Sequence, residues 1–147
     1  LRGCIQAAAV PDIDWRLNLA PVDFVARAVC FLSDHAASKE TIFHLANAES
    51  MHFKEIADFM RERGYALRMV SYDDWLKKIE SQGKENAIYP LLPWIYSANP
   101  FLNVEYDCSN LLRALQDTTI QCPTINAKLL GIYFDSFIKA NFLPDIP

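Results

Sequence analysis

The pattern of apolar and polar positions predicts three short strands in the first 83 residues. Residues 15–19 alternate between apolar and polar side chains, which is the two-residue period of a half-buried strand. Residues 41–46 are rich in β-branched and aromatic side chains, and residues 66–70 form a short apolar stretch. We therefore interpret both stretches as further strands.

Apolar positions at three- and four-residue spacing predict helices between and after these strands. Cap residues and helix-stopping residues give their approximate ends. The predicted helices are one begun by Pro21 and ended near Ser33, one capped by Ser50 and stopped by Gly64, one capped by Ser71, one from Ser109 to Gln116 after a cap at Asp107, and one from Ile125 to about Ala140.

The order of these elements predicts a helix-rich fold of the α/β to α+β class. Residues 1–83 read strand, helix, strand, helix, strand, and connections one helix long favour right-handed crossovers between parallel strands. We expect a small three-stranded, mainly parallel sheet there, and a helical segment over residues 84–147. The chain length suits one domain with its own core.

Composition and charge narrow the classes of partner. Charged residues make up 22% of the chain, the net charge is −4, and the two signs are interleaved. A nucleic-acid partner is therefore not expected, because binding phosphates needs a clustered excess of Lys and Arg. No apolar stretch approaches the roughly 20 residues that span a bilayer, so we expect no membrane segment.

The four cysteines indicate a cytoplasmic protein with free thiols. They are scattered and form no C-x-x-C pair, so neither a metal site nor a disulfide framework is expected. Buried free thiols are the simplest interpretation.

Motifs for nucleotide-dependent chemistry do not occur in this sequence. Its four glycines cannot be arranged into a glycine-rich phosphate turn, and none of its six tyrosines is followed by a lysine four positions later. We therefore expect no catalytic residue and no bound cofactor in this chain.

Isolated polar residues have structural explanations. His44 faces away from its apolar neighbours in the predicted strand, so we expect it to be exposed or locally hydrogen-bonded. His52 fits a surface position. Asp73 and Asp74 fall in the first turn after Ser71, where carboxylates complement the helix dipole.

Two surface features leave alternatives open. The basic residues Lys54, Arg61 and Arg63 could dock an acidic helix of a partner, or could belong to a solvated amphipathic face with its interleaved acidic residues. The aromatic residues between Trp94 and Phe101 could line an apolar pocket, although such clusters are more often core.

Taken together, several segments resemble the C-terminal half of extended short-chain dehydrogenases/reductases. The resemblance is closer to the thioester reductase domains of nonribosomal peptide synthetases, polyketide synthases and carboxylic acid reductases, and it covers nearly the whole chain. The segments that carry it are Gly3-Cys4-Ile5-Gln6, Val10-Pro11-Asp12, Asn18 to Ala28 with its Pro21-Val22-Asp23-Phe24-Val25-Ala26 motif, Phe43-His44-Leu45-Ala46-Asn47, Gly64-Tyr65-Ala66-Leu67, Ser71 to Leu76, Asp107-Cys108-Ser109, Cys122-Pro123 and Asn141-Phe142-Leu143-Pro144.

The resemblance implies a role in a larger reductase. The complete domain would bind NADPH in an upstream Rossmann half and reduce a thioester held on the phosphopantetheine arm of a carrier protein, releasing an aldehyde or alcohol. This chain would be the substrate-side lobe, inactive alone. The resemblance places Val10, Pro11, Pro21 and Asp23 near the substrate cleft, and we expect Lys54, Arg61 and Arg63 in the carrier-docking surface.

Two alternatives remain at the level of sequence. One is a free-standing protein-interaction or ligand-binding domain. The other is a lobe of a different extended reductase or epimerase that acts on small molecules.

Overall fold

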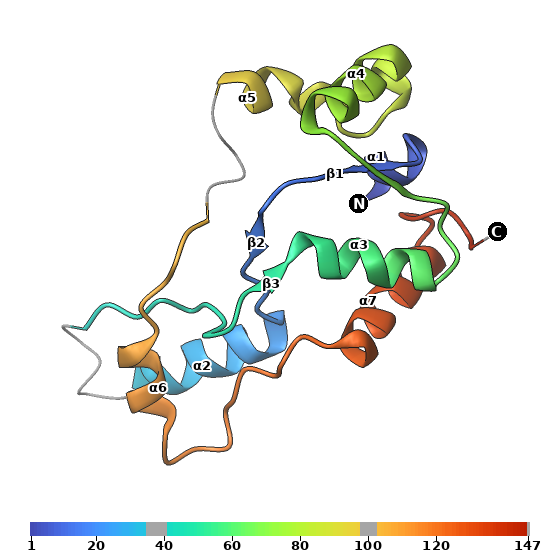
Figure 1. Ribbon diagram of the computed structural model, residues 1–147. Helices are drawn as coiled ribbons and strands as arrows, with labels where there is room; N and C mark the ends of the chain where they lie inside the picture. The colour runs from blue at the N-terminus through green and yellow to red at the C-terminus, as the bar shows by residue number, and fades with distance from the viewer. Residues whose placement is uncertain (35–40, 98–102, 147) are drawn as a thin grey trace. The chain divides into compact units, whose positions relative to one another are not determined.

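The computed structural model describes residues 1–34, 41–97 and 103–146, and it confirms a helix-rich fold with a small parallel sheet. Figure 1 labels most of the elements. In chain order they are α1 (Arg2–Gln6), β1 (Ala9–Pro11), β2 (Arg16–Leu17), α2 (Val22–Asp34), β3 (Met51–His52), α3 (Phe53–Glu62), β4 (Arg68–Val70), α4 (Tyr72–Gln82), η2 (Gly83–Glu85), η3 (Tyr89–Leu91), α5 (Leu92–Ser97), α6 (Ser109–Leu115) and α7 (Ala127–Lys139).

The chain forms two compact units, each built from separate stretches of sequence. Unit 1 comprises Leu1–Trp15, His52–Leu102 and Asn126–Pro147, and unit 2 comprises Arg16–Met51 and Asn103–Ile125. The units therefore alternate along the chain and do not divide at residue 83.

The parallel sheet lies in unit 1 and consists of β1 and β4. Val10 pairs with Met69 and Pro11 with Val70, and the backbone N–H of Asp12 extends the ladder by donating to the Val70 carbonyl at 2.8 Å. In the described residues, β2 pairs with β3 in a second two-stranded sheet, so the strands do not form the single three-stranded sheet that the pattern predicted. Strand β1 was not predicted, because its three residues are all buried and show no two-residue alternation of apolar and polar side chains.

The strand predicted over residues 41–46 was wrong, since the structure gives this segment no strand pairing. Side chains bind its carbonyl groups where a neighbouring strand would have done so. Nδ2 of Asn110 donates to the Ile42 carbonyl at 3.1 Å, and Sγ of Cys108 lies 3.7 Å from the Ala46 carbonyl. The β-branched and aromatic composition therefore reflects packing in unit 2, where Phe43 and Leu45 contact the apolar core.

Helix α3 buries the predicted apolar stripe but begins later than expected. Its buried residues are Phe53, Ile56, Ala57 and Met60. The cap is His52, so the assignment of Ser50 as N-cap was wrong. Oε1 of Glu55 accepts the His52 backbone N–H at 3.0 Å, which fixes the first turn two residues beyond Ser50.

Side-chain oxygens accept backbone N–H groups at the N-termini of the later helices. Ser71 caps α4 as predicted, because its Oγ accepts from the Asp74 backbone N–H at 3.2 Å. Before α6 the cap is Cys108, and Oδ1 of Asp107 accepts from the Ser109 backbone N–H at 2.9 Å. Helix α7 starts two residues after the predicted Ile125, since Asn126 Oδ1 accepts from Leu129 at 3.1 Å.

Two glycines of unit 1 should respond oppositely to alanine. Gly64 follows α3 at φ +106°, and an added Cβ would lie 2.8 Å from the Ile146 side chain. We expect Gly64→Ala to lower the free energy of unfolding by about 1–2 kcal/mol. Gly131 lies inside α7, where an added Cβ meets only Arg63 at 3.7 Å. Gly131→Ala should raise the free energy of unfolding by about 0.5–1 kcal/mol.

Urea unfolding followed by tryptophan fluorescence measures both changes, because Trp15, Trp75 and Trp94 all belong to unit 1. A loss of stability in Gly131→Ala equal to that in Gly64→Ala would contradict the backbone argument.

Candidate functional site

A groove in unit 1 opens where the two parallel strands end. Parallel strands bring their carboxyl ends to one edge, and in open α/β sheets ligands bind outside that edge. Here β1 ends at Pro11 and β4 at Val70. The groove has a volume of about 550 Å³ and is lined by Pro11, Asp12, Ile13, Asp14, His52, Lys54, Glu55, Asp58 and Met69.

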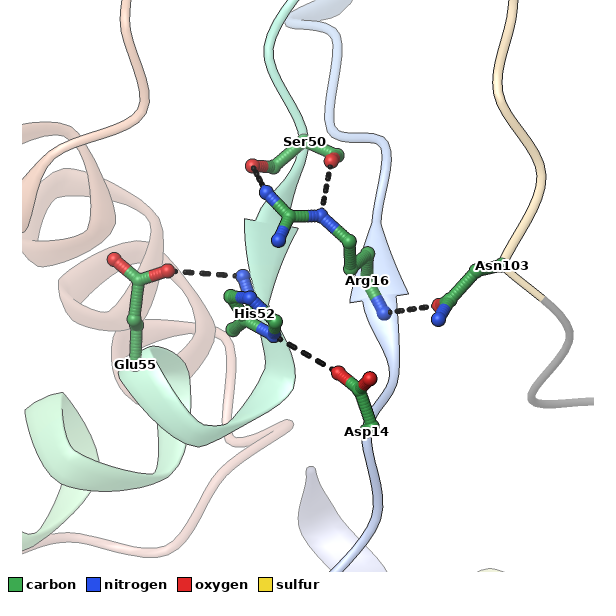
Figure 2. Close-up of polar contacts among 6 residues, drawn as sticks. All are labelled: Asp14, Arg16, Ser50, His52, Glu55 and Asn103. Atoms are coloured by element: carbon green, nitrogen blue, oxygen red, sulfur yellow. Dashed lines mark hydrogen bonds and ion pairs between the residues drawn. The ribbon is translucent and has the colours of Figure 1, made fainter.

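Polar contacts fix the start of α3 at the wall of this groove. Figure 2 shows His52 lying between Asp14 and Glu55. Nδ1 of His52 is 3.4 Å from Oδ1 of Asp14, while its backbone N–H donates to Glu55. The side chain of His52 is 42% exposed, in agreement with the predicted surface position.

The charge of the groove disfavours phosphate groups. Four carboxylates line it, against Lys54 and the His52 ring. A dinucleotide pyrophosphate binds where backbone N–H groups of a glycine-rich turn and a helix N-terminus face it. Neither Pro11 nor Asp12 provides such a turn, so the groove does not fit a dinucleotide cofactor.

A second polar cluster lies in unit 2 around Arg16. Its Nε donates to Ser50 Oγ at 2.9 Å, and its backbone N–H donates to Asn103 Oδ1 at 2.7 Å. Figure 2 shows Arg16 between these two partners. Ser50 therefore binds a guanidinium group and does not cap a helix.

Unit 2 also contains an apolar pocket of about 320 Å³. Phe24 of α2 and the leucines of α6 supply apolar side chains, and the loop at residues 46–49 contributes the polar residues Asn47 and Glu49. The lining residues are Phe24, Ala46, Asn47, Ala48, Glu49, Leu111, Leu112, Leu115, Gln116, Ile120, Gln121, Cys122 and Thr124.

A pair of asparagines holds the loop of this pocket. Asn18 and Asn47 exchange two hydrogen bonds of 2.7 and 2.9 Å between the side chain of Asn18 and the backbone of Asn47. The buried Asn47 side chain donates to the Leu19 carbonyl at 3.1 Å and accepts from the Glu49 backbone N–H at 3.0 Å. Every polar atom of the Asn47 side chain thus has a partner that positions the loop.

The cysteines are free, as predicted, but not all are buried. Cys4 and Cys108 are buried, whereas Cys30 is exposed and Cys122 is partly buried at the pocket. Burial raises the pKa of Cys122, and the nearby Cys108 and Asp23 raise it further. The sequence predicted no place for Cys122 at a pocket, because the lining residues come from segments that are distant along the chain.

The four residues expected at the substrate cleft fall in both units. Pro11 lines the groove of unit 1, while Val10 is fully buried in β1. In unit 2, Pro21 is buried and Asp23 is exposed in the first turn of α2, which also carries Phe24 of the pocket. Their placement at one cleft stays a prediction.

The three basic residues expected at a docking surface have different surroundings. Arg61 pairs with Asp58 and donates to the Leu67 carbonyl at 3.0 Å. Arg63 pairs with Asp135, and its guanidinium lies 5.8 Å from the centre of the Phe59 ring. Lys54 is exposed and lines the groove. It is therefore the best placed of the three to meet a partner.

The aromatic cluster expected to form a pocket or core is largely exposed. Trp94 and Tyr96 lie on α5 and are both more than half exposed, whereas Phe101 lies outside the described residues. Tyr96 lines a shallow pocket, and its O–H donates to Glu80 Oε1 at 2.6 Å. That hydrogen bond raises the pKa of Tyr96 to about 12.

His44 is exposed, as predicted from the sequence. Its Nδ1 lies at hydrogen-bond distance, 3.0 Å, from the Asp107 carbonyl oxygen. In the described ranges, no group of three or more His, Cys, Asp or Glu side chains is arranged to hold a metal ion. None of the helices found there is long and apolar enough to cross a bilayer.

Comparison with known proteins identifies relatives along the whole chain, although no family model matches it. The L-2-aminoadipate reductase large subunit of Eremothecium gossypii is 30% identical over 158 residues, which cover 99% of this chain and 11% of that protein. The isonitrile lipopeptide synthase of Streptomyces coeruleorubidus is 26% identical over 98% of this chain and 10% of its own length. The chain thus spans only a small part of these curated relatives.

A solved structure agrees closely with the fold. The terminal R domain from the myxalamid PKS-NRPS biosynthetic pathway superposes with a TM-score of 0.89 and 29% identity. The match covers 99% of this chain and 39% of that domain. From the sequence relatives and this structural match together, the chain corresponds along its whole length to part of the terminal reductase domains of nonribosomal peptide and polyketide synthases.

Proposed function

We propose that this chain is the substrate- and carrier-facing lobe of an NADPH-dependent thioester reductase in the cytoplasm. The complete enzyme would release an acyl or peptidyl thioester from a phosphopantetheinylated carrier protein as an aldehyde or alcohol. The observation that carries this proposal is the match of the whole chain to a terminal reductase domain at a TM-score of 0.89. The relatives that belong to peptide synthases support a carrier-bound substrate.

In this proposal the cofactor binds to an upstream Rossmann half of the same polypeptide. The sequence offers no glycine-rich turn, and the acidic groove of unit 1 repels phosphates. NADPH would supply the hydride, and the residues of this chain would exclude water and orient the thioester. In the complete enzyme Val10, Pro11, Pro21 and Asp23 would lie near the substrate cleft, as the resemblance implies.

The first test compares this chain alone with the chain joined to its nucleotide-binding half. We expect no NADPH binding by the isolated chain in titration calorimetry. The joined protein should oxidise NADPH when given an acyl thioester on a carrier. NADPH binding by the isolated chain would contradict the division of roles, and a joined protein that reduces no carrier-bound thioester would contradict the function.

Carrier docking gives a second test, built on Lys54. Carrier proteins with an acidic docking helix should lose attraction when Lys54→Glu reverses this charge. In the joined protein, KM for carrier-bound thioester should rise about three- to tenfold, with kcat retained. The KM for a free pantetheine thioester should stay unchanged.

The matched control is Lys84→Glu, because Lys84 is an exposed lysine of η2 in the same unit and does not line the groove. If both variants raise the KM equally, net charge and not a docking surface explains the effect.

The alternative of a free-standing interaction domain draws on one observation, the exposed aromatic residues Trp94 and Tyr96 on α5. It predicts a protein partner that binds this chain without any carrier or reductase activity. Carrier-dependent NADPH oxidation by the joined protein separates the two functions.

A further inference from the structure

The pocket of unit 2 has a preformed apolar wall. Phe24, Leu111 and Leu115 are almost completely buried members of the core that α2 and α6 build. Leu112 follows Leu111 in α6 and also lines the pocket, and its side chain is 57% exposed. Because helices carry this wall, it is held by the packing of the unit itself.

The charge of the lining selects the chemical class of ligand. Among the described residues around the pocket there is no Lys, Arg or His, and Glu49 is its one acidic residue. A carboxylate or phosphate would lose its hydration without gaining a cation, which is costly. Uncharged polar groups on Gln116, Gln121 and Thr124 can face the polar end of a neutral ligand.

We propose that this pocket binds the uncharged, medium-length alkyl part of an acyl group, with its apolar end against Phe24, Leu111 and Leu115. The inference deepens the proposed function and rests on it for biological meaning, since an acyl thioester is a neutral group with an apolar tail. The volume of about 320 Å³ lies at the lower end of ligand pockets, which suits an alkyl chain of medium length and no larger group.

Chain length provides a quantitative test with neutral amides as probes. Titration calorimetry on the 147-residue chain should give dissociation constants that fall about fourfold per added methylene from butanamide to octanamide. Octanoate should bind more weakly than octanamide, because its carboxylate meets no cation. Binding that is independent of chain length, or tighter for octanoate, would overturn the proposal.

Cys122 reports occupancy of the pocket directly. N-ethylmaleimide labels the thiolate, and burial raises the pKa of Cys122, so labelling is measured at about pH 8.5 and mapped by mass spectrometry. Saturating octanamide should slow labelling of Cys122 at least fivefold and leave the exposed Cys30 unchanged. Acetamide should protect neither. Equal effects on Cys30 and Cys122, or no protection, would contradict the assignment.

A matched pair of variants separates the pocket from general surface effects. Leu112→Asp places a carboxylate in the lining and should abolish protection of Cys122. Ile132→Asp is the control, because Ile132 on α7 is also 57% exposed and does not line the pocket. Retained protection in Leu112→Asp, or lost protection in Ile132→Asp, would overturn the proposal.

These measurements need neither NADPH nor a carrier, so they fail separately from the proposed function. An active joined reductase without protection of Cys122 would refute the acyl pocket alone. Protection of Cys122 together with an inactive joined protein would leave a neutral-ligand site and refute the reductase.

Discussion

Replacing Phe134 with alanine should lower the free energy of unfolding by about 3–5 kcal/mol, through lost apolar burial and the cavity left behind. Phe134 is 2% exposed in α7, and its ring lies 5.2 Å from that of Phe59 in an edge-to-face contact. The change therefore removes an edge-to-face contact between α7 and α3 inside unit 1. Urea unfolding followed by tryptophan fluorescence measures the loss.

The control is Phe142→Ala, because Phe142 is 50% exposed. Its ring contacts that of Phe137, which in turn contacts the ring of Phe134. We expect it to cost about 1 kcal/mol or less. Similar losses in the two variants would show that Phe134 is not the centre of this core.

Replacing Asn86 with alanine should cost about 2–4 kcal/mol, although it removes few apolar contacts. Asn86 is 1% exposed; its Nδ2 donates to the Gly3 carbonyl at 2.9 Å, and its Oδ1 accepts from the Ile88 backbone N–H at 2.8 Å. The alanine variant leaves the Ile88 backbone N–H and Gln82 Oε1 without this partner. It also removes one of the two hydrogen bonds of the Gly3 carbonyl, which keeps the Ala7 backbone N–H. The same unfolding experiment measures this loss.

Ser81→Ala is the corresponding control in unit 1, since Ser81 is exposed and donates one hydrogen bond to the Lys78 carbonyl. Water can replace that bond, so a change below about 1 kcal/mol is expected. An Asn86→Ala variant as stable as the parent chain would show that water satisfies the Ile88 backbone N–H and would contradict the prediction.

Sequence patterns predicted the helices well where burial follows one face. The stripe of α3 and the cap of α4 at Ser71 both appear as expected. The strand at residues 41–46 failed because its apolar side chains serve a core, while Asn110 and Cys108 take its carbonyl groups. A two-residue period cannot reveal which groups will satisfy the backbone.

The sites were predicted less completely than the fold. Pro11 lies at a groove, and whether this groove is the substrate cleft stays a prediction. The sequence did not place the carboxylates of this groove together, because they meet only at the paired ends of β1 and β4. Cys122 and Phe24 are separated by almost a hundred positions, so no local motif could place both at one pocket. Such sites depend on packing between distant helices.

The alternation of the two units has a consequence for the order in which a growing chain can fold. All segments of unit 2 have been synthesised once translation has passed Ile125, whereas unit 1 still lacks α7 and its buried Phe134 at that point. Strand β1 therefore belongs to the unit that is completed later of the two.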